Sequence, residues 1–170
     1  MATELQERYG DQIALSVGRL SFPLEGASSV CPPEPTVQSQ LDLGIAVVEP
    51  LGPISASGIE NLQLSVELTN VSENPIGFST GAAVGTIFDL SGKVVSDGAT
   101  TDLTLEEIPV SLGAGESIEL PLYASMASCD PAIGYVLPPG DYLIVAEVVR
   151  IGGGVVRLHS EPHAITIGDR

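Results

Sequence analysis

The sequence predicts an all-β fold in which antiparallel strands pack as a sandwich, preceded by an extended N-terminal arm. Three observations predict it. Several runs alternate apolar and polar residues with the period of a strand. Turn-forming residues separate these runs at intervals of about 8 to 12 residues, and no stretch alternates strands with helices. The 170 residues, 44% of them hydrophobic, suit one folded domain. We expect residues 1–30 to form the arm and residues 31–170 the sandwich.

The arm contains one short apolar run, Ile13–Val17, which predicts a strand, followed by a tether rich in Gly, Ser and Pro. The opening stretch, MATELQERYGDQ, lacks the basic region and the apolar core of a signal peptide. No stretch has the roughly 18 consecutive apolar residues of a membrane span. Two interpretations stay open: a cytosolic protein, or the mature or recombinant form of an exported one.

Four runs predict the principal strands of the sandwich. In TVQSQLDLGIAVVE the apolar residues of one parity are Val37, Leu41, Leu43, Ile45 and Val47. In NLQLSVELTN the inward residues are Leu62, Leu64, Val66 and Leu68, and the outward ones are Gln63, Ser65 and Glu67. In SIELPLY the inward residues are Ile118, Leu120 and Leu122. Pro121 removes a hydrogen-bond donor there, so we expect an edge strand or a bulge.

The fourth run, DYLIVAEVVRI, is apolar on both parities. This pattern predicts a central strand that is covered on both faces. Before it, Pro138, Pro139 and Gly140 predict a type II turn. Further turns are expected at 70–75, 89–93, 96–98, 113–117 and 151–154. Only ATELQERYG and DLTLEEI have any helical tendency, and we expect eight to ten strands in all.

The two cysteines have matching surroundings. Cys31 lies in SSVCPPEP and Cys129 in MASCDPAI, so each stands beside proline in a loop-like stretch. Two such thiols in a proline-rich chain of secreted type predict one disulfide, which would join the loop before the last strands to the start of the first core strand. Two unrelated free thiols are the alternative.

Charge restricts the class of partner. The chain has 22 acidic and 6 basic residues, a formal net charge of −16, and a single lysine, Lys93. A negative field repels a phosphate backbone, so we expect no nucleic-acid partner and no insertion into a membrane. A solubilising surface is the simpler interpretation of the acidity. An acidic patch that recruits a basic or calcium-loaded protein is the other.

The order of elements resembles BsuPI-type proteinase inhibitor domains and actinobacterial secreted immunoglobulin-like domains over roughly residues 61–150. The matching elements are Asn70, the stretch 78–81 (FSTG), Asp89 with Gly92, Leu112 with Gly115 and Glu116, and the stretch 139–142 (PGDY). The resemblance implies an immunoglobulin-like sandwich and, for the inhibitors, protease inhibition. This chain departs from the inhibitor pattern because it has no tryptophan, and Tyr123 and Met126 stand where the pattern has one.

The chain has no P-loop, G-x-G-x-x-G or H-E-x-x-H motif. Its one G-x-S-x-G spacing, GFSTG at 77–81, does not stand between a strand and a helix as a nucleophile elbow does. The stretch HSEPH offers His159, Glu161 and His163 on one parity, but its proline interrupts the strand, and we expect a polar strand end without a metal. Calcium is conceivable if loop carboxylates converge at one end of the sandwich, the candidates being Asp89, Asp97, Asp102, Asp130 and Asp141. We expect no cofactor.

The sequence therefore predicts a secreted or surface-exposed immunoglobulin-like module that binds or assembles with proteins and catalyses no reaction. Two alternatives stay open. One is a proteinase inhibitor of the BsuPI type. The other is a self-assembling subunit in which the strand Ile13–Val17 of the arm is added to an open sheet edge of a neighbour.

Overall fold

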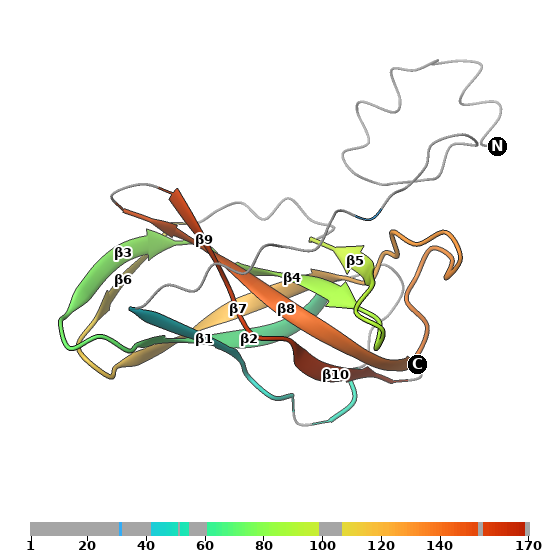
Figure 1. Cartoon of the computed structure of the whole chain (residues 1–170), viewed down its shortest axis with the longest axis horizontal. Coiled ribbons are helices and arrows are strands. Elements are labelled where there is room, and N and C mark those ends of the chain that lie inside the picture. The colour runs from blue at the N-terminus through green and yellow to red at the C-terminus, as the bar shows by residue number, and fades with distance from the viewer. Residues whose placement is uncertain are drawn as a thin grey trace, which may run out of the picture.

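The protein is all-β in the part of the chain that the computed structural model describes, namely residues 31, 42–50, 52–54, 61–98, 107–152 and 155–168. The described residues form ten strands and no helix (Figure 1). The strands are β1 Leu43–Val47, β2 Asn61–Asn70, β3 Ile76–Thr80, β4 Ala83–Phe88, β5 Val94–Asp97, β6 Ile108–Leu112, β7 Ser117–Ser125, β8 Gly140–Ile151, β9 Val155–His159 and β10 His163–Ile167. The predicted number of strands is confirmed. The predicted arm, residues 1–30, lies outside the described residues.

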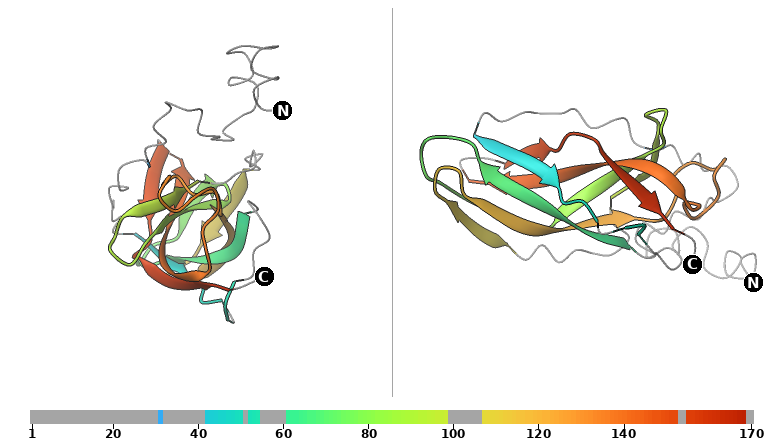
Figure 2. Two further views of the ribbon diagram at one scale, coloured as in Figure 1. Left: turned by 90° about the vertical axis from the view of Figure 1, so that its right-hand side faces the viewer. Right: turned by 90° about the horizontal axis from the view of Figure 1, so that it is seen from below.

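The ten strands belong to one hydrogen-bonded sheet. Its order is β1-β2-β7-β4-β8-β3-β6, with β5 paired to β4 and with β9 and β10 both paired to β8. The end-on view in Figure 2 shows the strands arranged around a common interior. Among the ten strands one pairing is parallel, between residues 83–85 of β4 and 122–124 of β7. The sheet is therefore mixed, whereas the sequence predicted antiparallel strands throughout.

The core is continuous from one end of the sheet to the other, because every strand contributes a buried apolar side chain to it. Leu62, Val66 and Leu68 of β2 point into it, as their alternation predicted. Gly85 on β4 lies deep in this core, where a Cβ atom would come within 2.8 Å of both Ala124 and Ile144. Only glycine allows β4 to approach its neighbours this closely.

A corner of the sheet is fastened by Asn70, the last residue of β2. The ribbon of β2 and β7 continues beyond this corner as β3 and β6. The buried Asn70 amide donates hydrogen bonds to the carbonyls of Asn74 (2.8 Å), Leu112 (3.1 Å) and Gly113 (3.0 Å). Its side-chain oxygen accepts one from the Ser72 N–H at 2.9 Å. The Asn70 side chain thus ties the turn after β2 to the end of β6.

Pro121 does not make β7 an edge strand, and that prediction was wrong. β7 pairs with β2 along its whole length and with β4 from Leu122 onward. The Ser65 carbonyl accepts a bond from the Val48 N–H at 2.9 Å, so the backbone of Ser65 points to β1 and not to Pro121 opposite it. The proline nitrogen therefore points to the other side of β7, one residue before the pairing with β4 begins. No ladder bond is lost.

β8 is the central strand that its apolar run predicted. It pairs with β4 on one edge and with β9 and β10 end to end on the other. Its residues 142, 144, 146 and 148 face the main core. Leu143 and Val145 face a second apolar cluster on the opposite side. Both faces of β8 are covered, which explains the lack of alternation.

The turn before β8 differs from the prediction. A type II turn would give Gly140 a φ of about +80°, but its φ is 156°, and Gly140 is already paired with Ile167 of β10. The Tyr142 hydroxyl donates to the Pro138 carbonyl at 2.8 Å and holds the two prolines against the start of β8. Extended pairing with β10 replaces the tight turn.

Candidate functional site

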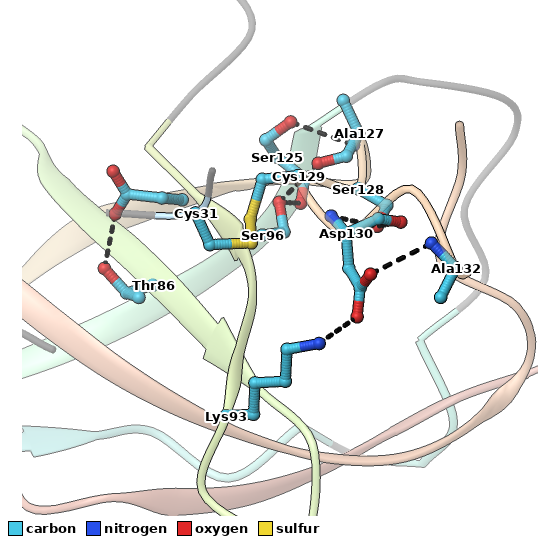
Figure 3. The surroundings of a disulfide bond; sticks show 11 residues. Cys31, Thr86, Lys93, Ser96, Ser125, Ala127, Ser128, Cys129, Asp130 and Ala132 are labelled. Carbon is cyan, nitrogen blue, oxygen red and sulfur yellow. Dashed lines mark hydrogen bonds and ion pairs between the residues drawn. A yellow bond between two sulfur atoms is a disulfide. The ribbon is translucent and has the colours of Figure 1, made fainter. Parts of the chain in front are cut away.

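The predicted disulfide between Cys31 and Cys129 is present (Figure 3), with the two Cα atoms 5.1 Å apart. The Cys129 N–H donates to the Val95 carbonyl at 2.9 Å, which ties this half of the bond to β5. Cys31 is separated from β1 by residues 32–41, which lie outside the described part of the chain. The disulfide that the cysteine context predicted is thus confirmed, and the alternative of two free thiols was wrong.

The disulfide covers the second apolar cluster. This cluster consists of Phe88, Val94 and Val145, all buried, with Leu143 and the two cysteines packed against it. Phe88 and Val145 come from the outer faces of β4 and β8, which would otherwise meet water. The bond therefore serves as a cover for this side of the sheet as well as a crosslink.

Lys93 lies beside the disulfide and binds a carboxylate of its own chain. Its Nζ donates to Asp130 at 2.5 Å, and Asp130 also accepts from the Ala132 N–H at 2.9 Å (Figure 3). The hydrogen bond from Lys93 lowers the pKa of Asp130, and the same bond raises the pKa of Lys93. In the same turn, the hydrogen bond from the Ser91 hydroxyl lowers the pKa of Asp89. These groups stay ionised near neutral pH.

The loop carboxylates considered for calcium do not converge on one point. Asp97 accepts from the Thr86 hydroxyl at 2.7 Å, and Asp141 accepts from the Thr166 hydroxyl at 2.8 Å. Asp89 and Asp130 lie near Lys93, whose ammonium provides the positive charge there. Asp102 lies outside the described residues. In the described part of the chain, no three His, Cys, Asp or Glu side chains are grouped to hold a metal ion.

The histidines of HSEPH are separated from one another. His159 ends β9, and its Nε2 lies 3.2 Å from the carboxylate of Glu147 on β8, which also binds Arg157. His163 begins β10, and Glu161 is exposed in the link between the two strands. The Nδ1 atom of His159 and the Nε2 atom of His163 are buried, and neither has a hydrogen-bond partner. The three side chains therefore do not form a ligand set among the described residues, and His159 instead contacts Glu147 of the neighbouring strand.

A groove lies between the outer face of β2 and β7 and the stretch that follows β1, and sequence reasoning did not single it out. It has a volume of about 410 Å³ and is lined by Val48, Glu49, Pro50, Gln63, Leu64, Ser65, Pro121 and Tyr123. Gln63 lies opposite Tyr123, and Ser65 opposite Pro121, in the antiparallel register. The alternation predicted that Gln63 and Ser65 point outward. Only the register of β2 with β7 brings them beside an aromatic ring and a proline.

Two glutamates face each other directly beside this groove. Glu67 of β2 is paired in register with Glu119 of β7, and both are exposed. Like Ser65 and Pro121, the two glutamates form a non-hydrogen-bonded pair of the antiparallel ladder, in which the facing residues exchange no backbone bonds. The Cα atoms of such a pair are only about 4.5 Å apart, and the side chains lie close together. In the next pair of this kind, the hydroxyls of Thr69 and Ser117 hydrogen-bond across the strands at 2.8 Å. Like charges placed this way repel each other.

We name this surface the acidic sheet face. It comprises the groove together with Ala46, Glu67, Thr69, Ser117 and Glu119. Ala46 is the β1 neighbour of Glu67 in the register. We call each facing pair of residues a row. The row of Glu67 and Glu119 lies two residues along the strands from the row of Ser65 and Pro121, a distance of about 7 Å.

No helix within the described residues has the length and apolar character to cross a membrane. No protein-family model matches the chain, and no curated protein matches it. Neither comparison bears on the resemblance to BsuPI-type domains.

Some solved structures align with parts of this chain. A β-glucosidase from Listeria innocua in complex with gluconolactone is 14% identical, with a TM-score of 0.39 over 75% of this chain and 16% of that chain. An alkylpurine DNA glycosylase from Pseudomonas fluorescens is 16% identical, with a TM-score of 0.35 over 75% of this chain and 31% of that one. A GH3 β-glucosidase from Bifidobacterium adolescentis is 17% identical, with a TM-score of 0.35 over 74% and 17%. The chain thus spans less than a third of each, and likenesses this distant support no functional argument.

Proposed function

We propose that the protein is a non-catalytic binding module of immunoglobulin-like type that contacts a protein partner through the acidic sheet face. The observation that carries this proposal is the groove, in which Tyr123 and two prolines, Pro50 and Pro121, meet on an open sheet surface. Tyrosine supplies a large, rigid contact area with a polar end, and it is enriched at protein interfaces. A groove of this composition suits a peptide segment of another protein.

The polar clusters elsewhere are engaged in bonds that stabilise the fold, which supports binding over catalysis. Lys93 is bound to Asp130, and Glu147 is held between Arg157 and His159. Each therefore contributes to holding strands and loops together.

The disulfide supports a secreted or surface location for this module. Disulfides persist in oxidising compartments and are rare in the cytosol. The bond between Cys31 and Cys129 also packs against an apolar cluster, which gives it a structural role in the fold. We infer that the protein works where thiols are oxidised.

Site-specific photo-crosslinking tests the proposed function. A photoreactive phenylalanine analogue is placed at position 123 of the full chain, and the protein is illuminated with the secreted and surface proteins of its source. We expect a discrete adduct that excess unlabelled protein abolishes. The control carries the same analogue at Tyr135, which is 61% exposed but lies outside the groove. Identical adducts from both positions, or none from position 123, would contradict the proposal.

Strand donation is a second candidate, because β1 and β6 end the order of the sheet. Among the described residues, each of them is paired along one edge only. An unpaired edge can accept a strand from another chain. Sedimentation velocity of the full chain and of Ser111→Lys, a change at an exposed position of β6, tests this candidate. Association that the lysine abolishes would support it, and a monomer at all concentrations would remove it.

A further inference from the structure

We propose that the acidic sheet face binds an extended segment of a partner protein in which a lysine or arginine stands two residues from an apolar residue or proline. This inference rests on the proposed function and adds the kind of partner. The basic side chain lies between Glu67 and Glu119, and the apolar one enters the groove against Pro121 and Tyr123.

The facing glutamates concentrate negative charge at one point of the acidic sheet face. Glu67 and Glu119 lie opposite each other in the closest kind of cross-strand pair, which is unfavourable without a counter-charge. The described basic side chains are bound elsewhere: Lys93 to Asp130, Arg150 to Asp42 and Arg157 to Glu147. A cation from a partner placed between the two carboxylates would remove their repulsion and make charge-assisted hydrogen bonds to both.

The groove sets the second position of the motif. Its row of Ser65 and Pro121 is two residues from the row of glutamates along the strands, which is about 7 Å. An extended peptide has the same repeat, so its residues i and i+2 fall on the two rows when it runs along the strands. Tyr123 and Pro121 offer apolar surface to the second residue, and Glu49 on the groove wall favours a further basic group.

A second copy of this chain is a poor occupant of the face. Each copy carries a formal charge of −16, and a symmetric contact through this face would oppose the glutamate pairs of both copies. Nucleic acid and anionic membranes are repelled by the same charge. A basic segment is the occupant whose charge complements this surface, and its association should be fast and sensitive to salt.

Fluorescence anisotropy with labelled octapeptides tests the inference on the full chain. The probes contain Arg-x-Leu or Arg-x-Pro, and the comparison peptides carry Glu in place of Arg, or the same residues in adjacent positions. We expect binding of the Arg-x-Leu and Arg-x-Pro probes only, weakened by raising the salt. Glu67→Gln combined with Glu119→Gln should reduce affinity about tenfold or more, as should Tyr123→Ala.

The matched control removes two charges away from the face, with Glu73→Gln and Glu161→Gln, both at exposed positions in links between strands. It should bind the peptides like the unaltered chain. The inference is overturned if no arginine peptide binds at low salt, or if the variant at positions 67 and 119 binds as tightly as the control. Self-association lost in that variant would instead assign the face to a second copy.

The two proposals fail separately. A specific adduct from position 123 without any binding of arginine peptides would keep the binding module and overturn the basic motif. The absence of both an adduct and peptide binding would overturn both.

Discussion

At the scale of single residues, Asn70 makes more structural hydrogen bonds than an asparagine in a turn is expected to make from the sequence alone. An asparagine at the end of a strand is an ordinary turn residue. Here it is buried and bonds to three carbonyls that belong to two separate stretches of chain. One amide group therefore bonds to both turns at the corner between the β2–β7 ribbon and the β3–β6 ribbon.

Asn70→Ala should destabilise the protein by about 1 to 3 kcal/mol, because it removes the hydrogen bonds from a buried amide to three backbone carbonyls. Urea unfolding followed by circular dichroism measures the change. Asn74→Ala is the matched control, since Asn74 is exposed and takes part through its backbone carbonyl. An equal loss in both variants would show that the corner does not depend on the Asn70 side chain.

The pH dependence of stability also belongs to single residues. The pKa of Asp130 is lowered in the folded state, first by the hydrogen bond from Lys93 and then by the Ala132 N–H. A carboxyl with a lowered folded pKa stabilises the fold at pH values above its unfolded pKa, about 3.9, and this contribution is lost as the pH falls through the folded pKa.

Asp130→Asn should therefore be less stable than the unaltered protein at pH 6, and the difference should shrink below about pH 4. Chemical unfolding at a series of pH values measures it. Asp141→Asn, at an exposed aspartate that binds a threonine hydroxyl, is the comparison. A difference that stays constant down to pH 2 would show that the ion pair with Lys93 has no linked effect on stability.

At the scale of elements, β2 and β7 form a ladder with two different faces. The side chains of its inner face pack favourably, whereas its outer face contains an unfavourable pair of like charges. The inner residues form the core, as their alternation predicted. On the outer face, Glu67 and Glu119 face each other across the two strands. A cross-strand pair is stabilised by charges of different sign, and these two charges have the same sign. Binding of a positively charged partner, as proposed above, is a reason for the sheet to keep this unfavourable pair of glutamates.

Removing this repulsion should stabilise the free protein. Glu67→Gln or Glu119→Gln is expected to raise the free energy of unfolding by about 0.2 to 1 kcal/mol at low salt, and by less at high salt, where charges are screened. Thermal unfolding at two ionic strengths measures the gain. Glu73→Gln, in the turn after β2, should give a smaller change. If either strand variant is less stable than the unaltered chain, the two carboxylates do not repel.

At the scale of the whole molecule, one crosslink joins distant parts of the chain. The disulfide spans a sequence separation of 98 residues and lies over the apolar cluster on the outer faces of β4 and β8. Its loss should therefore destabilise the fold in two ways. It raises the conformational entropy of the unfolded chain, and it exposes apolar surface of the folded chain to water.

Cys31→Ala combined with Cys129→Ala should lower stability by about 4 to 5 kcal/mol, the value for a closed loop of this length, and the unfolding midpoint by roughly 10 °C. Calorimetry measures the midpoint, and binding of a hydrophobic dye below it reports the uncovered cluster. Reductant should reproduce both effects in the unaltered protein and do nothing to the double variant. An unchanged midpoint would show that the cover is dispensable.

Much of the architecture could be predicted from the sequence, because it depends on patterns along one chain. Alternation in β2 identified its buried face, Gly and Pro clusters marked most links between strands, and the proline-flanked cysteines indicated their own pairing. The apolar run of β8 predicted a strand covered on both faces. These properties follow from side-chain direction and turn chemistry, which are local.

What only the tertiary structure decided is which strands are neighbours. The parallel contact of β4 with β7 involves three residue pairs, too few to leave a pattern in either strand. Pro121 lies within a paired strand because its nitrogen points to the side where pairing with β4 has not begun. The groove and the facing glutamates come from the register of β2 with β7, and register is a relation between distant segments that periodicity within either one does not specify.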